Sequence, residues 1–201
     1  KQSWCEVLLS LKSCGMNAPK RTIGDGAMGF WAAMDEVYPE ARQQRCWQHK
    51  TMNVLNCLAK LFQPKAKAAI HNIWQAENKV DAEKAFNLFI ETYESKYPKA
   101  ALCLQKDRIE RMAFFDFPVQ HWQSIRTSNP IEPAFATIRH RTKRSKGCLS
   151  RDGMCHMMSK LGQCAERNWL KLRVFDYLAK VITGVTFKDG IETTDPDQIA
   201  A

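Results

Sequence analysis

The stretch Arg21-Thr22-Ile23-Gly24-Asp25-Gly26 decides the fold of the N-terminal part of this chain. Its first four residues predict a short strand, and the Asp-Gly pair predicts that this strand ends at Asp25. The apolar residues between Met28 and Val37 recur at helical spacing and predict an amphipathic helix, which Pro39 ends. A second short strand is predicted from Gln43 to Trp47. This order of strand, helix and strand indicates an α/β core.

Most of the remaining chain has helical periodicity. A first helix is predicted from Trp4 to Leu11, ended by Cys14-Gly15. From His49 to about Phe115 the pattern is again helical, with breaks near Gln63-Pro64, Glu77 to Val80 and Tyr97-Pro98. One apolar stripe runs through this region at helical spacing and consists of Phe86, Phe89, Ile90, Tyr93 and Tyr97. We therefore expect an α/β but predominantly helical fold, with an all-α subdomain beside a small strand-containing core.

The C-terminal part is expected to return to the core. Asp116 to Arg126 is interpreted as a linker with aromatic anchors, and helices are predicted near Pro130 to Arg144 and Ser150 to Leu172. The polar tail from Thr193 is expected to fray. The expected organisation is a partial core over residues 1–48, a helical insertion over 49–120, and returning helices with a basic segment over 121–201.

Composition and charge narrow the class of protein. The 201 residues are 45% apolar, and 30 Lys and Arg against 21 Asp and Glu give a net charge of +9, which favours polyanionic partners. No apolar run approaches the length of a membrane span and no leader precedes the first helix, so we expect a cytoplasmic, nucleoid-associated protein without membrane contact. The chain starts at Lys1 without Met, and is expected to be a piece of a longer protein.

Two acidic residues stand where a metal ligand would be useful. Asp25 follows a strand and precedes two glycines, so its carboxylate can project from the edge of the sheet. The alternative is an Asp-Gly turn or a helix N-cap. Glu132 lies at the mouth of a predicted helix, but Asn129, Pro130 and Glu132 also have the spacing of a capping box. Pro133 disfavours helical dihedrals at Glu132 and indicates that the helix starts one turn later.

Cys46 and His49 have the spacing of half a zinc site, without a convincing second half elsewhere in the sequence. They are interpreted instead as a thiol and an imidazole at a strand-to-helix junction, helping to shape the catalytic face. His49 as a polar cap remains an alternative.

A basic run follows Glu132 and consists of Arg139, Arg141, Lys143, Arg144 and Lys146. A solvated helix end would account for one or two of these cations. Five cations in eight residues fit contacts to the phosphates of DNA or RNA better.

Three motifs, in this order and spacing, resemble the prokaryotic mutator-type transposase family. They are Ile23-Gly24-Asp25-Gly26-Ala27-Met28-Gly29-Phe30-Trp31, Gln44-Arg45-Cys46-Trp47-Gln48-His49-Lys50-Thr51 and Thr127-Ser128-Asn129-Pro130-Ile131-Glu132. The resemblance implies a partial RNase H-like catalytic core with a DDE triad and an all-α insertion between the second and third acids. Asp25 matches the second acid, Glu132 the third, and Cys46 with His49 the C-x2-H signature.

The resemblance implies a DNA transposase that uses Mg²⁺ or Mn²⁺, held by Asp25 and Glu132, for phosphodiester cleavage and strand transfer. Its partners would be transposon ends and target DNA, with a homo-oligomer in the full-length protein. The family's first Asp stands upstream of Lys1, so the chain alone is expected to be inactive. Two alternatives stay open: an RNase H-like nuclease or resolvase, and a helical DNA-binding module without chemistry.

Overall fold

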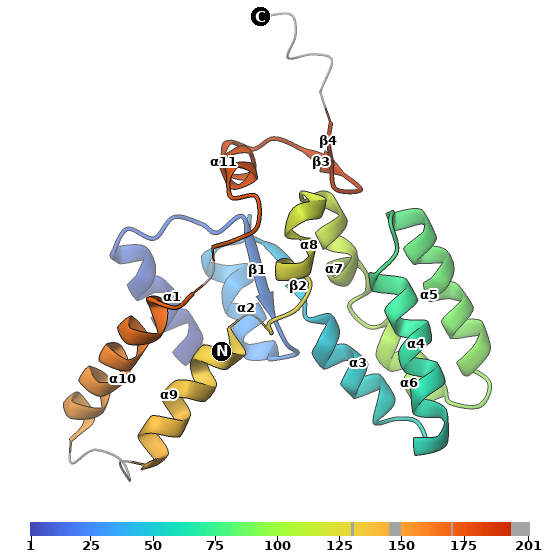
Figure 1. Ribbon diagram of the computed structural model, residues 1–201, viewed down its shortest axis with the longest axis horizontal. Coiled ribbons are helices and arrows are strands. Elements are labelled where there is room, and N and C mark those ends of the chain that lie inside the picture. Colours follow the sequence, from blue (N-terminus) through green and yellow to red (C-terminus); the bar gives the residue numbers. More distant parts are fainter. Residues whose placement is uncertain (130, 145–149, 170, 194–201) are drawn as a thin grey trace, which may run out of the picture.

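The computed structural model describes residues 1–129, 131–144, 150–169 and 171–193. Lys146, the last cation of the basic run, lies outside these ranges. Within them the protein is mostly helical, with one small parallel and one small antiparallel sheet (Figure 1). None of the helices in the described ranges has the length and apolar character that crossing a membrane requires.

The strands β1 (Arg21–Gly24) and β2 (Arg42–Arg45) form a two-stranded parallel sheet connected by α2 (Met28–Val37). Gly24 pairs with Arg45 in the register, and the backbone N–H of Cys46 donates to the Gly24 carbonyl at 2.7 Å. Because parallel strands end at the same edge of a sheet, Asp25 and Cys46 follow side by side at that edge. The strand-helix-strand order is therefore confirmed.

The predicted end of the second strand is wrong. The expectation was Gln43 to Trp47, whereas β2 ends at Arg45 and Trp47 is the first residue of α3 (Trp47–Leu55). Trp47 turns away from the ladder because its indole N–H donates to the Arg111 carbonyl at 3.0 Å and its ring is fully buried. Tertiary packing thus overrides the strand preference of a Trp residue.

The N-terminal helix α1 (Gln2–Ser13) packs against α2. Gly15 follows it at φ +91°, and the N–H groups of Gly15 and Met16 return to carbonyls of the last turn, so the predicted glycine stop is confirmed. A small core joins these helices and consists of Cys5, Leu8, Ala33, Met34, Val37, Tyr38 and Ala41.

To the right of the two strands in Figure 1 lies a group of helices with a larger core. After α3 its elements are η1 (Lys60–Phe62), α4 (Gln63–Trp74), α5 (Lys79–Tyr93), α6 (Pro98–Gln105), α7 (Arg108–Met112) and η2 (Ala113–Asp116). All five residues of the predicted apolar stripe pack in or against this core: Phe86, Phe89, Ile90, Tyr93 and Tyr97. The predicted break near Gln63-Pro64 is confirmed as a helix boundary, because α4 starts at Gln63 and Pro64 fits its first turn.

The expected linker from Asp116 to Arg126 is wrong, because it contains η3 (Val119–His121) and α8 (Trp122–Ile125). Trp122 fixes this segment. Its ring packs edge-on against Phe114 and Phe115, and its indole N–H donates to the Phe117 carbonyl at 2.7 Å.

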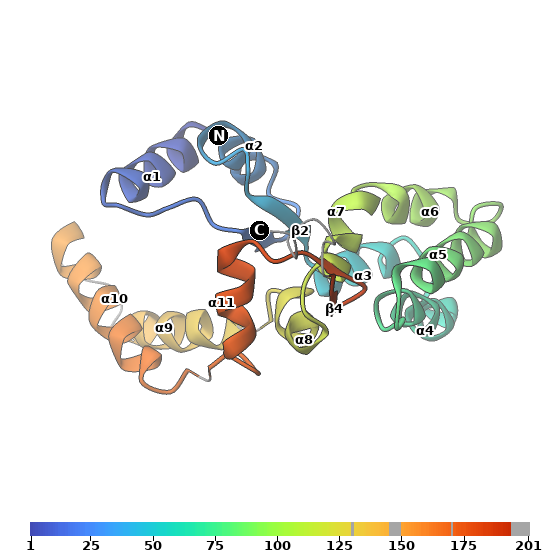
Figure 2. The same cartoon turned by 90° about the horizontal axis from the view of Figure 1, so that it is seen from above.

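The C-terminal part has α9 (Glu132–Arg144), α10 (Arg151–Glu166), α11 (Asp176–Thr183) and the hairpin of β3 (Phe187–Lys188) and β4 (Ile191–Glu192). The helix expected to reach Leu172 therefore stops at Glu166, and the sequence did not predict α11 or the hairpin. Seen from above, α9 and α10 lie on the opposite side of the sheet from α1 and α2 (Figure 2). The two small parallel strands do not by themselves establish an RNase H-like sheet.

Candidate functional site

Asp25 is held by its backbone and by one of its carboxylate oxygens. Oδ1 accepts the N–H of Ala27 at 3.0 Å, as in the Asp-Gly turn considered from the sequence. The Asp25 carbonyl accepts the indole N–H of Trp31 at 2.8 Å and is 3.4 Å from Nη1 of Arg45. The residue itself is exposed. These bonds fix the position of the carboxylate. Its second oxygen, Oδ2, is not used by the turn and can bind a ligand.

Cys46 and His49 contact each other directly at the start of α3. Cys46 is the N-cap residue, with extended dihedrals, and only 2% of its surface is exposed. Residues three apart share a helix face, so Nδ1 of His49 comes within 3.2 Å of Sγ of Cys46. The imidazole is thereby oriented with its Nε2 pointing away from the thiol.

Ser128 joins this pair to the third motif. Its backbone N–H and hydroxyl lie 3.3 and 3.4 Å from Sγ of Cys46, and its hydroxyl is 3.3 Å from Nδ1 of His49. The same hydroxyl donates to Oε1 of Glu132 at 3.4 Å. The N–H of Trp47 also donates to the carbonyl of Arg126, two residues before Ser128. The segments around Cys46 and Ser128, 82 positions apart in the sequence, thus meet at the carboxyl edge of β2.

Glu132 is the first residue of α9, so the helix begins later than an Asn129 cap would give. Pro133 falls in the first turn, where its missing N–H leaves no helical bond unmade. Oε1 of Glu132 lies 3.7 Å from Nε2 of His49, with 55% and 43% of the two side chains exposed. Among the described residues, the carboxylate therefore contacts Ser128 and His49 in place of the backbone N–H that a capping box requires.

Charges in this cluster shift two pKa values. Burial opposes ionisation of the Cys46 thiol, but hydrogen bonds from His49 and Ser128 together lower its pKa. The pKa of His49 is raised by its hydrogen bond to Cys46, against burial, and further by the charges of Cys46, Glu132 and Asp25. Both candidate acids therefore act electrostatically on the same imidazole, although they are 107 positions apart in the sequence.

A groove of about 830 Å³ opens beside this cluster. It is lined by Gln48, His49, Asn129, Glu132, Pro133, Phe135, Ala136 and Arg139. Arg139 and Lys143 lie seven and eleven residues after Glu132, positions that return to the same face of a helix, whereas Arg141 lies on the opposite face. The described cations of the basic run, Arg139, Arg141, Lys143 and Arg144, take part in none of the ion pairs between described residues.

The chemistry of Asp25 and Glu132 suits a divalent metal ion. Mg²⁺ and Mn²⁺ prefer carboxylate oxygens, and within the described residues neither Asp25 nor Glu132 is paired with Lys or Arg. The described ranges hold no group of three or more His, Cys, Asp or Glu side chains arranged for a metal ion. The two acids thus suit such an ion by their chemistry, without a third ligand grouped with them in the described ranges.

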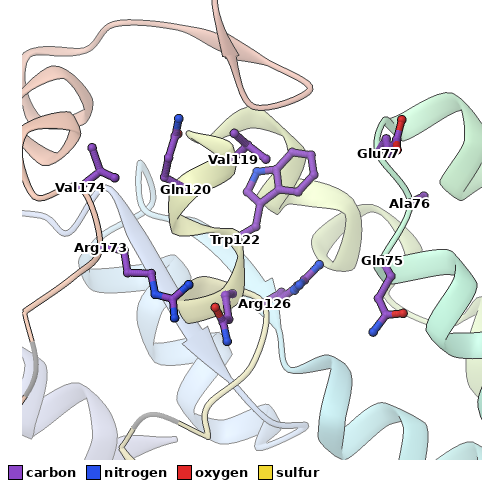
Figure 3. A pocket seen from close by; sticks show the side chains of 10 residues that line it. Gln75, Ala76, Glu77, Val119, Gln120, Trp122, Arg126, Arg173 and Val174 are labelled. Atoms are coloured by element: carbon purple, nitrogen blue, oxygen red, sulfur yellow. The ribbon is translucent and has the colours of Figure 1, made fainter.

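A second hollow, of about 570 Å³, lies between the turn from α4 to α5, α8 and the segment around Val174. Figure 3 shows Trp122 and Arg126 between Arg173 and Val174 on the left and Gln75, Ala76 and Glu77 on the right. Glu77 is the single carboxylate among the described residues that line it. This hollow therefore does not offer paired carboxylates.

Sequence reasoning gave no role to Ser128, Trp31 or Arg45, although all three lie within the quoted motifs. The contacts of Ser128 with Cys46 span 82 positions, and those of Arg45 with Asp25 span 20. A periodicity pattern carries no signal for contacts of this kind.

Comparison with known proteins agrees with the motifs. The family model described as "Transposase, Mutator family" matches residues 1–171. The transposase for insertion sequence element IST2 of Acidithiobacillus ferrooxidans is 50% identical over 206 residues, covering 100% of this chain and 70% of that protein. The transposase for IS6120 of Mycolicibacterium smegmatis is 42% identical, covering 94% of this chain and 58% of that protein.

The similarity extends to the transposase for IS905 of Lactococcus lactis, which is 30% identical over 71% of this chain and 36% of its own length. The chain thus spans between about one third and 70% of the length of these relatives. The family match covers all three motifs and the site they form. The chain belongs to the Mutator family of transposases.

Proposed function

We propose that this chain contributes Asp25 and Glu132 as metal-binding carboxylates to a DNA transposase that cleaves the ends of an insertion element and joins them to target DNA. The observation that carries the proposal is their common neighbour. Glu132 lies 3.7 Å from His49, and the charges of both acids raise the pKa of that residue. Carboxylates from two distant motifs, one beside this imidazole and the other at the adjacent strand end, are what a metal site needs.

Each side chain of the cluster has a separate role in this proposal. Asp25, fixed through its carbonyl and Oδ1, presents its other oxygen at the end of β1, while Glu132 presents its carboxylate from the first turn of α9. His49 and Ser128 orient the Glu132 carboxylate from the other side. When bound, Mg²⁺ or Mn²⁺ would activate the attacking oxygen and stabilise the leaving oxygen of an in-line displacement at phosphorus.

The proposal includes an RNase H-like core formed by residues 1–48 and 121–201, with residues 49–120 as a helical insertion. The position of Asp25 and Cys46 at the shared carboxyl edge of β1 and β2 supports it, because active sites of open α/β sheets lie there. A third carboxylate, which the family resemblance puts upstream of Lys1, would complete the ligand set.

DNA would run along the groove beside α9. Arg139 lines this groove together with His49 and Glu132, and Lys143 shares its helix face. Cations there would neutralise phosphates next to the metal-binding carboxylates. The transposon ends, the target DNA and a homo-oligomer that pairs two ends are part of this proposal for the whole protein.

Paramagnetic NMR on this chain tests the metal site. Mn²⁺ added to the ¹⁵N-labelled protein should broaden amide signals around Asp25 and around Glu132 together, even when binding is weak. Asp25→Asn and Glu132→Gln should each reduce broadening at both segments, because one ion is shared. Asp35→Asn is the matched control, since Asp35 is an exposed acid of α2 that contacts Gln43 and not the cluster.

The rival function is a helical DNA-binding module without chemistry. The bonds from Ala27 to Oδ1 of Asp25 and from Ser128 to Glu132 favour it, because both also occur in purely structural turns and caps. If broadening at the two segments is unchanged in Asp25→Asn and Glu132→Gln, the rival function replaces the catalytic one.

A further inference from the structure

Two side chains converge on the backbone carbonyl of Asp25. Nε1 of Trp31 donates to this oxygen at 2.8 Å, and Nη1 of Arg45 lies 3.4 Å from it. The Arg45 guanidinium also stacks over the Trp31 ring, 4.1 Å from its centroid. The three groups form a closed set of contacts at the end of β1, and neither Trp31 nor Arg45 has a role in the proposed chemistry.

The Trp31 ring packs directly on β1 at Gly24. Its ring is 3% exposed, and a Cβ placed on Gly24 would come within 2.9 Å of its Cζ2 atom. A glycine immediately before Asp25 is therefore required for the indole to reach the Asp25 carbonyl. The sequence Gly24-Asp25 and the ring of Trp31 act as one packing unit.

Arg45 is held by an ion pair with Asp107, which belongs to the helical region. Its Nη2 lies 3.8 Å from Oδ1 of Asp107, with 15% and 20% of the two side chains exposed. Asp107 stands between α6 and α7 at φ +61°, a conformation that Asp tolerates better than most residues. Its other carboxylate oxygen contacts Nζ of Lys50 at 3.4 Å. The helical region from α3 to α7 is thereby connected to the end of β1.

We propose that Trp31 and Arg45 are positioning residues that fix the orientation of the Asp25 carboxylate, with Asp107 linking them to the helical region. This proposal rests on the proposed function of Asp25 as a metal ligand. Bonds to the Asp25 carbonyl fix the peptide plane after this residue, and the Ala27 N–H then fixes Oδ1. A carboxylate held in one orientation loses less freedom when it binds a cation.

The experiment compares variants of the ¹⁵N-labelled chain. Trp31→Phe keeps a ring for Arg45 to stack on and removes the N–H donor, and Arg45→Met removes the charge and the second contact. We expect each to raise the amide exchange rate of Ala27 and to weaken apparent Mn²⁺ binding at Asp25 by roughly twofold to tenfold, the range of one net hydrogen bond. Because the proposed ion is shared, broadening near Glu132 should fall in parallel.

Arg42→Met is the matched control, because Arg42 is in the same strand and pairs with Asp116 at 2.5 Å but does not contact Asp25. A loss of packing alone would lower the melting temperature without a selective change at Ala27. If the Trp31 variant fails to fold, exchange of the Trp31 indole N–H in the unaltered chain still decides, since rapid exchange would contradict its bond to Asp25.

The two proposals fail separately. If Asp25→Asn abolishes Mn²⁺ broadening but Trp31→Phe and Arg45→Met match the Arg42→Met control at Ala27 and at Asp25, the positioning role is wrong and the metal site stands. If Asp25→Asn leaves the broadening unchanged, the metal site is wrong and a positioning role toward it falls as well.

Discussion

Nε2 of His49 lies 3.7 Å from Oε1 of Glu132, so the pKa of the His49 imidazole in one motif depends on the charge of Glu132 in another. The pKa of His49 is raised above its ordinary 6.5 by Cys46, Glu132 and Asp25. The protonated imidazole is thus favoured in the folded state. Its stabilising contribution is complete below pH 6.5 and is lost as the pH rises through the raised pKa.

We expect Glu132→Gln and Asp25→Asn each to lower the pKa of His49, because each removes a negative charge beside it. NMR titration of the imidazole signals measures this, with His49→Asn to assign the resonance. Asp35→Asn should leave the midpoint in place. An unchanged midpoint in Asp25→Asn would mean that Asp25 lies too far from His49 to share a site with Glu132.

Removal of the Cys46 thiol should destabilise the fold. Cys46→Ala removes a buried thiol and leaves the partly buried N–H of Ser128 without its acceptor, and we expect a loss of about 1 to 3 kcal/mol in unfolding free energy. Urea denaturation measures the change. Cys57→Ala, at an exposed cysteine, should stay within about 0.5 kcal/mol of the unaltered chain. Equal effects would contradict the assigned contact.

The face of α9 should decide which cations bind DNA. Arg139→Gln should weaken binding and reduce the slope of log K against log salt by about 1, as expected for one lost phosphate contact. Arg141→Gln, on the opposite face, changes the same net charge and should reduce affinity less. Fluorescence anisotropy with duplex DNA at several salt concentrations separates the two. Equal losses would indicate attraction by overall charge.

Replacing glycine by alanine should have opposite effects on stability at Gly190 and at Gly162. Gly190 has φ +78°, and a Cβ there would lie 2.6 Å from Cβ of Val119. We expect Gly190→Ala to cost about 2 to 4 kcal/mol through strain and overlap. Gly162, inside α10, has nothing within 4 Å of such a Cβ, and Gly162→Ala should stabilise by about 0.5 to 1 kcal/mol. Thermal unfolding with opposite shifts would agree with both environments.

Local patterns predicted the parts of the site that depend on local structure. The strand before Asp25, the helix after it and the helical character of the region from His49 onward all follow from periodicity and from glycine and proline stops. The parallel pairing that puts Asp25 and Cys46 at one edge is a finding of the structure.

Contacts between distant segments could not be read in the same way. Ser128 reaches Cys46 only after the chain has returned from the helical region, and the contact depends on how that region packs. The hairpin of β3 and β4 has two residues in each strand, too few for an alternation pattern. Trp122 appeared as an aromatic anchor, but its burial against Phe114 created a helix where a linker was expected.

The family match ends at residue 171, yet the molecule continues to fold upon itself well past that point. At the hairpin tip, Asp189 accepts the N–H of Lys79, while Gly190 exchanges backbone bonds with Phe115 and Val119. The hairpin near the end of the described chain thus packs over Phe115 and Trp122, which lie about 70 positions earlier in the sequence. A shortened version cut at the limit of the shared region would leave those rings open to water, and it should be prone to aggregate even though every proposed metal ligand is retained.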